Sequence, residues 1–131
     1  MLQVNETRSS LFKNDGKGGF VIEPFPQMAQ LSYVFAAYDG DLDRDGIKDV
    51  FLAGNFYGLK PQAGRFDASY GVTLLGQKAD SIQKMKRENF IYLPPSQSGL
   101  FVNGEVRDIK KVGNYLVVAV NNQPLKIFKA R

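Results

Sequence analysis

Apolar and aromatic residues in this chain fall into short runs of three to eight residues, separated by turns rich in Gly, Pro, Asn and Asp. Runs of this length, bounded by turn residues, are typical of β-strands. Many short strands of this kind predict an all-β fold, which can be a sandwich, a barrel or a propeller. We expect nine or ten strands, over residues 11–13, 20–22, 31–38, 50–53, 70–76, 90–93, 100–102, 106–112, 115–120 and 125–128.

The C-terminal part of the pattern distinguishes two kinds of strand. Residues 115–120 are the most hydrophobic run, and we predict that they are buried on both faces. Residues 125–128 alternate apolar with polar positions, which favours an edge strand. Residues 77–88 are polar, with apolar side chains every third residue, so that a short amphipathic helix and a charged hairpin loop both remain open.

Composition removes several classes of function. The 131-residue chain has neither Cys nor His, which excludes disulfides, Cys/His zinc sites, thiol nucleophiles and the commonest general base. The net charge is +4 and the pI about 9.3, which raises the alternative of a nucleic-acid-binding module. The basic residues are scattered, however, apart from Lys84, Lys86 and Arg87, and scattered charge favours a solvated surface.

Residues 39–49 stand apart from the rest, because they hold five of the thirteen carboxylates. From Asp41 onward the spacing is D-x-D-x-D-G-x-x-D. Oxygen ligands at positions 1, 3, 5 and 9, with a backbone carbonyl at position 7, suit Ca²⁺, and a glycine at position 6 permits the sharp turn. The predicted metal ligands are therefore Asp41, Asp43, Asp45, the Ile47 carbonyl and Asp49.

The flanks of this segment argue against a helical EF-hand. An EF-hand closes its site with a Glu at position 12, which here is Leu52. The runs on either side, 31–38 and 50–53, have strand composition, so we expect the loop to join two strands. A solvated Asp-rich turn without metal is the remaining alternative.

Several segments together resemble the FG-GAP (VCBS-type) repeat proteins, bacterial relatives of the integrin alpha-chain propeller. The most specific match is the aspartate loop with the strand after it, residues 41–55. The other matching segments are residues 11–20 (LFKNDGKGGF), 64–71 (GRFDASYG), 104–109 (GEVRDI) and 120–125 (VNNQPL).

This resemblance implies a β-propeller of four-stranded antiparallel blades, a structural Ca²⁺ in the loop, and binding or adhesion in place of catalysis. It also implies export to the periplasm or cell surface as part of a bacterial protein. Asp39 lies outside the ligand set, and we expect it to bind through water or not at all. Residues 77–88 replace the glycine-rich hairpin of the family with a longer, charged segment.

The resemblance also implies how the chain is organised. We expect a single β region over residues 1–131, in which 9–30 form the hairpin of a preceding blade, 31–95 the blade with the calcium loop and 96–131 the strands of a terminal blade. Two to three blades do not close a propeller. We therefore expect the remaining blades of a larger chain, or a second copy, as partners, beside a protein or carbohydrate ligand.

The function expected from the sequence is thus that of a calcium-stabilised binding, adhesion or structural module. A metal-assisted lyase or hydrolase domain is the enzymatic alternative, although no second carboxylate cluster is visible. Residues 1–8 lack the apolar core of a signal peptide, so we expect a fragment or mature form, or a chain that stays inside the cell. No apolar run is long enough for a membrane-spanning helix.

Overall fold

The computed structural model describes residues 3–78 and 89–129, and these residues form an all-β protein with very little helix. The prediction of an all-β fold is therefore confirmed. The strands are β1 (Ser10–Asn14), β2 (Phe20–Pro24), β3 (Val34–Gly40), β4 (Asp49–Gly54), β5 (Val72–Gly76), β6 (Phe90–Leu93), β7 (Val106–Val112), β8 (Tyr115–Val120) and β9 (Lys126–Lys129). The helical turns are η1 (Gln27–Gln30), η2 (Pro61–Ala63) and α2 (Pro95–Ser98).

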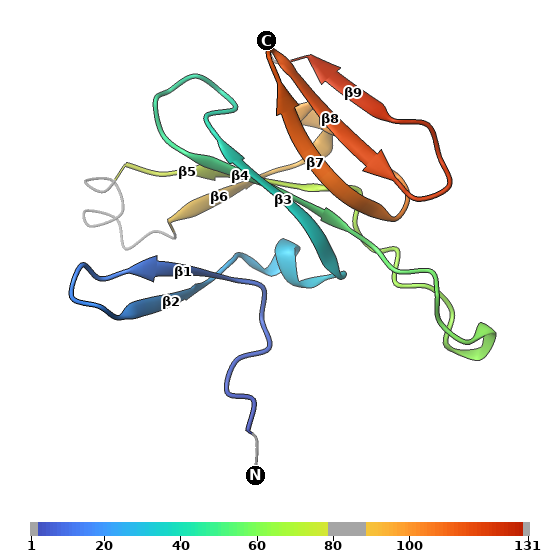
Figure 1. Ribbon diagram of the computed structural model, residues 1–131, viewed down its shortest axis with the longest axis horizontal. Coiled ribbons are helices and arrows are strands. Elements are labelled where there is room, and N and C mark those ends of the chain that lie inside the picture. Colours follow the sequence, from blue (N-terminus) through green and yellow to red (C-terminus); the bar gives the residue numbers. More distant parts are fainter. Residues whose placement is uncertain (1–2, 79–88, 130–131) are drawn as a thin grey trace.

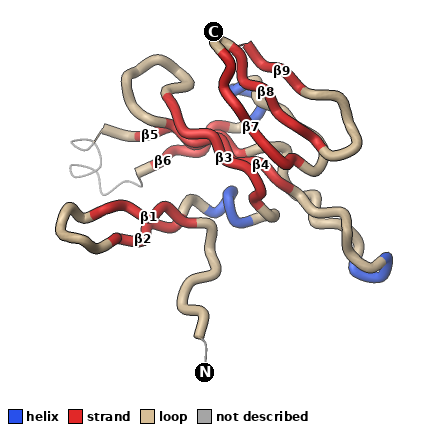
Figure 2. The backbone as a smooth tube through the Cα atoms, viewed as in Figure 1, coloured by secondary structure: helices blue, strands red, loops and turns tan. Residues whose placement is uncertain are grey.

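The strands make three antiparallel sheets, each a simple meander in chain order (Figure 1). The first sheet is the hairpin β1-β2, the second has the order β3-β4-β5-β6, and the third has the order β7-β8-β9. Figure 2 shows that the helical turns lie only in the connections between strands. None of the helices in the described ranges has the length and apolarity that crossing a membrane requires.

The second and third sheets pack face to face around one hydrophobic cluster. Phe51 and Ala53 of β4 meet Ile109, Leu116 and Val118 of the third sheet, and all five are buried. Burial of these side chains supplies the main free energy that holds the two sheets together. In Figure 1 the third sheet accordingly lies across β3 and β4.

A second cluster covers the opposite face of the second sheet. Val50, Leu52 and Leu74 pack there against Ala29 of η1, with Phe25 at the margin of the cluster. Because β4 is covered on both faces, every residue of Asp49–Gly54 is buried. β4 is thus buried on both faces, and β5 nearly so, because only Leu75 of Val72–Gly76 is half-buried.

The prediction that residues 115–120 are buried on both faces is wrong. In β8 the residues Leu116, Val118 and Val120 are buried, whereas Val117 and Ala119 are only half-buried and Tyr115 is exposed. The reason is that, among the residues that the structure describes, another layer lies against only one face of the third sheet. The edge strand predicted over residues 125–128 is β9, Lys126–Lys129, which lies at the edge of the third sheet within the described residues.

The prediction of a strand over residues 100–102 is also wrong. These residues form no ladder; Val102 donates one backbone hydrogen bond to the Tyr70 carbonyl oxygen at 2.9 Å and buries its side chain in the core. The apolar residues of this segment therefore contribute to packing, and their backbone joins no sheet. For residues 77–88 a short amphipathic helix and a charged hairpin loop were the two alternatives. This segment lies mostly outside the described residues, because these stop after residue 78 and resume at residue 89.

The second and third sheets share one pattern of strand register. Val34 pairs with Gly54 and Ala36 with Ala53, with a bulge between them, and Val106 pairs with Val120 and Asp108 with Ala119, again with a bulge. The pairing of the third strand in each sheet also agrees. Leu52 of β4 pairs with Val72 of β5, and Val118 of β8, which is equivalent to Leu52, pairs with Lys126 of β9.

The corner after the second strand of each sheet is closed in the same way. The backbone N–H of Asn55 donates to the Tyr33 carbonyl, and that of Asn121 donates to the Glu105 carbonyl. The strands β7, β8 and β9 are therefore structural equivalents of β3, β4 and β5, and the third sheet has no described counterpart of β6.

Candidate metal centre

The aspartate-rich segment forms the connection of the β3–β4 hairpin. β3 ends at Gly40 and β4 begins at Asp49, so that residues 41–48, the acidic loop, project from one end of the second sheet (Figure 1). The prediction that the loop joins two strands is confirmed. Pairing of Gly40 with Asp49 sets the base of the loop.

The fold brings three of the predicted ligands together. One carboxylate oxygen from each of Asp41, Asp43 and Asp49 lies within 4.8 Å of the others. Asp41 and Asp43 are exposed, whereas Asp49 is 1% exposed. The cluster therefore has one buried carboxylate at its base and two exposed ones at its mouth. Carboxylates this close repel one another unless a cation or a proton lies among them.

Asp49 is held in place by backbone donors from two sides. Its Oδ2 accepts from the Leu42 N–H at 2.7 Å, and its Oδ1 accepts from the Gly76 N–H at 2.9 Å. Burial raises the pKa of the Asp49 carboxyl above its ordinary value, the two N–H donors lower it, and the neighbouring Asp43 charge raises it further. Either a proton or a bound cation would compensate the part of this buried charge that the two N–H donors leave uncompensated.

The turn of the loop depends on two residues in the left-handed region. Arg44 has a φ of 68° and Gly46 a φ of 85°. Asp41 braces this turn, because its two oxygens accept from the Arg44 N–H at 2.6 Å and the Gly46 N–H at 3.0 Å. Only glycine adopts such a φ without steric cost, so Gly46 has the role that the sequence predicted for it.

Asp45 lies outside the group of three carboxylates. Its Oδ1 accepts from the Ile47 N–H at 2.8 Å, and its own N–H donates to Asp43 at 3.1 Å. The assignment of Asp45 and of the Ile47 carbonyl as ligands stays a prediction. These short hydrogen bonds also stabilise an Asp-rich turn without an ion.

Asp39 forms an ion pair outside the group of three carboxylates. Its Oδ2 accepts from the Lys48 Nζ at 2.7 Å, in an ion pair whose side chains are both largely exposed. The Lys48 hydrogen bond and charge lower the pKa of the Asp39 carboxyl. This pairing agrees with the expectation that Asp39 stands outside the ligand set.

Gly76 is the residue that sequence reasoning missed. A side chain at Gly76 would overlap the Lys48 carbonyl and the Ile47 side chain, so glycine is what allows the acidic loop to approach β5. Its N–H also orients Asp49. The sequence shows a glycine at the end of a strand, but nothing in it indicates that this end lies beside the loop.

The donor set fits a hard cation. Carboxylate oxygens are ligands that Ca²⁺ prefers, and because Asp41 and Asp43 are exposed, the cluster is open to solvent on that side. The sequence contains neither Cys nor His, so neither a thiolate nor an imidazole is available as a ligand. An ion bound here would neutralise the repulsion among Asp41, Asp43 and Asp49 and fix the acidic loop against β5.

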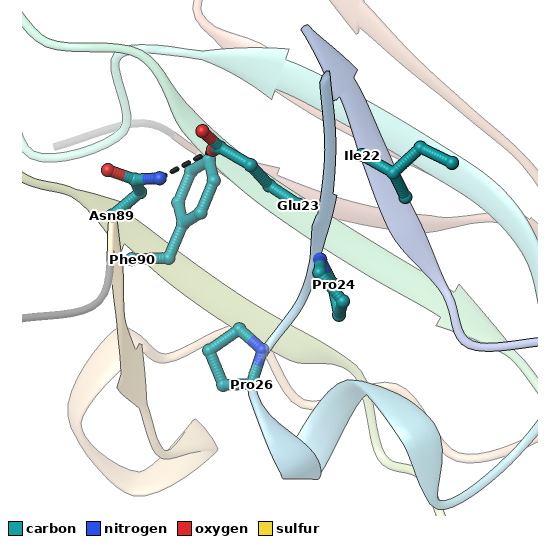
Figure 3. A pocket seen from close by; sticks show the side chains of 6 residues that line it. All are labelled: Ile22, Glu23, Pro24, Pro26, Asn89 and Phe90. Carbon is teal, nitrogen blue, oxygen red and sulfur yellow. Dashed lines mark hydrogen bonds between the residues drawn. The ribbon is translucent and has the colours of Figure 1, made fainter. Parts of the chain in front are cut away.

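A pocket of about 240 Å³ lies elsewhere, between β2 and the start of β6 (Figure 3). Its walls are Ile22, Pro24, Pro26 and Phe90, and Glu23 accepts a hydrogen bond from the Asn89 amide at its edge. No aspartate of the acidic loop lines this pocket. A metal-assisted reaction would need a pocket beside the ion, and this pocket does not meet that condition.

Comparison with known proteins gives no additional assignment. No family model, curated protein or solved structure matches the chain.

Proposed function

We propose that this chain is a calcium-stabilised β-propeller segment that acts as a binding, adhesion or structural module of an exported bacterial protein, similar to the FG-GAP (VCBS-type) repeat proteins. The observation that carries the proposal is the convergence of Asp41, Asp43 and Asp49 within 4.8 Å at the turn of a β-hairpin. Ca²⁺ is the ion, with Asp45 and the Ile47 carbonyl as further ligands. Its role is structural.

The shared register of the second and third sheets supports the propeller. The face of the second sheet that carries Phe51 is covered by the third sheet. The equivalent face of the third sheet carries Tyr115, Val117 and Ile127. On this face Tyr115 is 46% exposed and Ile127 is 62% exposed. A repeating arrangement places another sheet on this face.

This outer face also indicates the kind of partner. It is a sheet surface with several exposed apolar side chains, which monomeric proteins usually cover. The remaining blades of a larger chain, or a second copy of this one, supply a sheet of matching twist. The ligand of the assembled module is a protein or a carbohydrate.

The expected effect of the ion on stability follows from linkage. Extracellular calcium modules bind with a Kd of about 10⁻⁴–10⁻³ M. At a calcium concentration ten times the Kd, binding adds about 1.4 kcal/mol to the free energy of unfolding. For a domain of this size that corresponds to a rise in Tm of about 4–6 °C.

Thermal unfolding with calcium and with a chelator tests the proposal. We expect calcium to raise the Tm of the parent chain by several degrees and to leave Asp43→Asn nearly unmoved, because Asn removes a charged ligand at an exposed position. Asp45→Ala tests the predicted fourth carboxylate in the same way. Asp39→Asn is the matched control, since Asp39 pairs with Lys48 outside the cluster.

The control variant should keep the full calcium response. Equal melting curves with calcium and with chelator for the parent would remove the calcium site. An equal loss of response in Asp39→Asn and Asp43→Asn would show that general negative charge, and not a site, attracts the ion.

A further inference from the structure

Aromatic side chains gather at the end of the second sheet that lies opposite the acidic loop. β3 begins there at Val34 and β4 ends there at Gly54, whereas the acidic loop connects the other ends of the same two strands (Figure 1). We call this the aromatic end. Its rings between 43% and 52% exposed are those of Tyr33, Phe35, Phe66, Tyr70 and Phe101. Clustered exposed apolar side chains of this kind mark binding surfaces.

The exposed rings form two groups with a defined geometry. In the first group, the ring centroid of Tyr33 lies 5.1 Å from that of Phe66 and 6.2 Å from that of Phe35. In the second group, Tyr70 and Phe101 stack at 4.8 Å, with an angle of 17° between the ring planes. Because rings at these distances stabilise one another, each group presents its rings in a fixed arrangement.

A buried polar residue holds the segments that carry these rings. Asn55 is 1% exposed, and its backbone N–H donates to the Tyr33 carbonyl at 3.0 Å. Its side-chain amide donates to the Ser69 and Gly104 carbonyls at 2.7 and 3.2 Å, and its Oδ1 accepts from the Ser32 hydroxyl at 2.8 Å. The segments that precede β3, β5 and β7 therefore meet at one side chain. Rings held in this way need little further ordering when a ligand binds, which lowers the cost of binding.

The charged groups beside the rings are balanced. The Arg107 guanidinium lies over a ring of the first group, 4.8 Å from its centre, and pairs with Glu105 at 2.9 Å. Phe66 stands in the chain between Arg65 and Asp67. A polyanion such as a nucleic acid needs uncompensated Lys and Arg side chains, so the balance of charge here favours an uncharged ligand.

Hydroxyl groups lie next to the second group of rings. A recess of about 100 Å³ adjoins Tyr70, and Ser69 and Tyr92 are among the residues that line it. Ring faces, hydroxyls and planar charged groups thus occur together at the aromatic end. A pyranose ring has the complementary surface, because its C–H groups pack on the negative face of an aromatic ring. Its hydroxyls can pair with Arg, Asp and Ser side chains.

We propose that the aromatic end binds a neutral oligosaccharide, with Tyr33 and Phe66 as the platform for one sugar ring and Tyr70 as the platform for another. The inference rests on the proposed function as a binding module and assigns the class of its ligand. In such a module further sheets pack on sheet faces, as the third sheet packs on the second. The strand ends and their connections stay open to a ligand.

An array of neutral and sulfated oligosaccharides, incubated with the labelled full chain in calcium, is the probe. We expect binding to neutral oligosaccharides. Saturation-transfer NMR with the neutral oligosaccharide that binds most tightly should show its C–H protons against aromatic protons of the protein. The affinity should change by less than about twofold between about 0.05 and 0.5 M NaCl, because binding of an uncharged ligand releases no counterions.

Ring variants test the platform. Tyr33→Ala should weaken binding of that oligosaccharide about tenfold, the size of one ring contact, and Tyr33→Phe by less than about threefold. Phe66→Ala should behave as Tyr33→Ala does. Phe20→Ala is the matched control, because Phe20 lies in β2, is 64% exposed and stands outside the aromatic end. The Tm of each variant with calcium and with chelator shows that it folds and keeps its calcium response.

Three results would overturn the proposal. One is binding to no neutral oligosaccharide on the array, which would leave a protein as the ligand. Another is binding that is confined to sulfated oligosaccharides or falls steeply with salt. The third is an equal loss of affinity in Phe20→Ala and Tyr33→Ala. If no oligosaccharide binds but calcium still raises the Tm, only the ligand class is wrong. Binding without a calcium response would instead remove the calcium site and leave this inference standing.

Discussion

The β3–β4 and β7–β8 hairpins have the same strand register and the same bulge, but they turn in different ways. Between Val112 and Tyr115 the chain turns through two residues, whereas between their equivalents, Gly40 and Asp49, it inserts the acidic loop of eight. Only the longer connection gathers carboxylates. The same register and bulge thus form in the third sheet without an eight-residue loop. A bound ion would therefore stabilise the loop and not create the fold.

Burial differs at equivalent positions of the two hairpins, and it gives the largest predicted effect. Phe51 is 0% exposed between two layers, and its equivalent Val117 is half-buried on the outer face. We expect Phe51→Ala to lower the free energy of unfolding by about 3–5 kcal/mol, as large core deletions do, and Val117→Ala to lower it by about 1 kcal/mol. Urea titration of both variants measures this. Similar losses would mean that the outer face of the third sheet is covered in solution.

The base of the acidic loop gives the next effect. Asp49→Ala removes the acceptor of the Leu42 and Gly76 N–H groups, and orphaned buried donors cost about 1–3 kcal/mol. Relief of the buried charge offsets part of this cost, so we expect a net loss of about 2 kcal/mol in chelator. Tyr115→Ala, at the equivalent exposed position, should cost less than about 1 kcal/mol. An unchanged urea midpoint for Asp49→Ala would show that its hydrogen bonds do not support the fold.

A carboxylate at the corner of the third sheet should make the stability of the protein depend on pH. Glu105 occupies the position of Tyr33, and its carboxylate accepts from the Asn121 side-chain amide, the Tyr57 N–H and Arg107. The hydrogen bond from Asn121, followed by that from Tyr57, lowers the pKa of Glu105 below its ordinary value of 4.5.

Because the pKa of Glu105 is lower in the folded state, its contribution is complete above pH 4.5 and is lost as the pH falls through the folded pKa. We expect Glu105→Gln to flatten the acid side of a plot of Tm against pH. Asp67→Asn, an exposed carboxylate of another connection, serves as the control. Parallel plots for the parent and Glu105→Gln would contradict this prediction.

Replacing the connection of the β3–β4 hairpin by that of the β7–β8 hairpin should have the smallest effect on stability and the clearest effect on the calcium response. Replacing residues 41–48 by Gly-Asn, the turn of the β7–β8 hairpin, should lower the free energy of unfolding in chelator by about 1 kcal/mol. The short turn closes at little entropic cost, but the exchange removes the packing of Leu42 against the core and its hydrogen bond to Asp49. The calcium response should disappear. Failure of the exchanged chain to fold would show that the acidic loop is part of the framework.

The sequence predicted local elements well where turn chemistry and apolar runs agreed. The hairpin of β1 and β2 followed from residues 14–19, and the loop between two strands followed from the aspartates and from Leu52 at position 12. Residues 100–102 were assigned wrongly, because an apolar run does not show whether its backbone pairs. The structure buries β4, and not β8, on both faces. This difference depends on which sheets pack against each strand, and the hydrophobicity of a strand alone does not contain that information.

The sequence by itself determined that the chain is all-β and that five carboxylates are confined to residues 39–49, because turn residues and ligand spacing act over a few positions. Only the tertiary structure decided which carboxylates converge. Asp49 is oriented by Gly76, a residue of another strand, and Asp39 is drawn away by Lys48. The equivalence of the second and third sheets likewise arises from strand register, which forms only when distant segments pair.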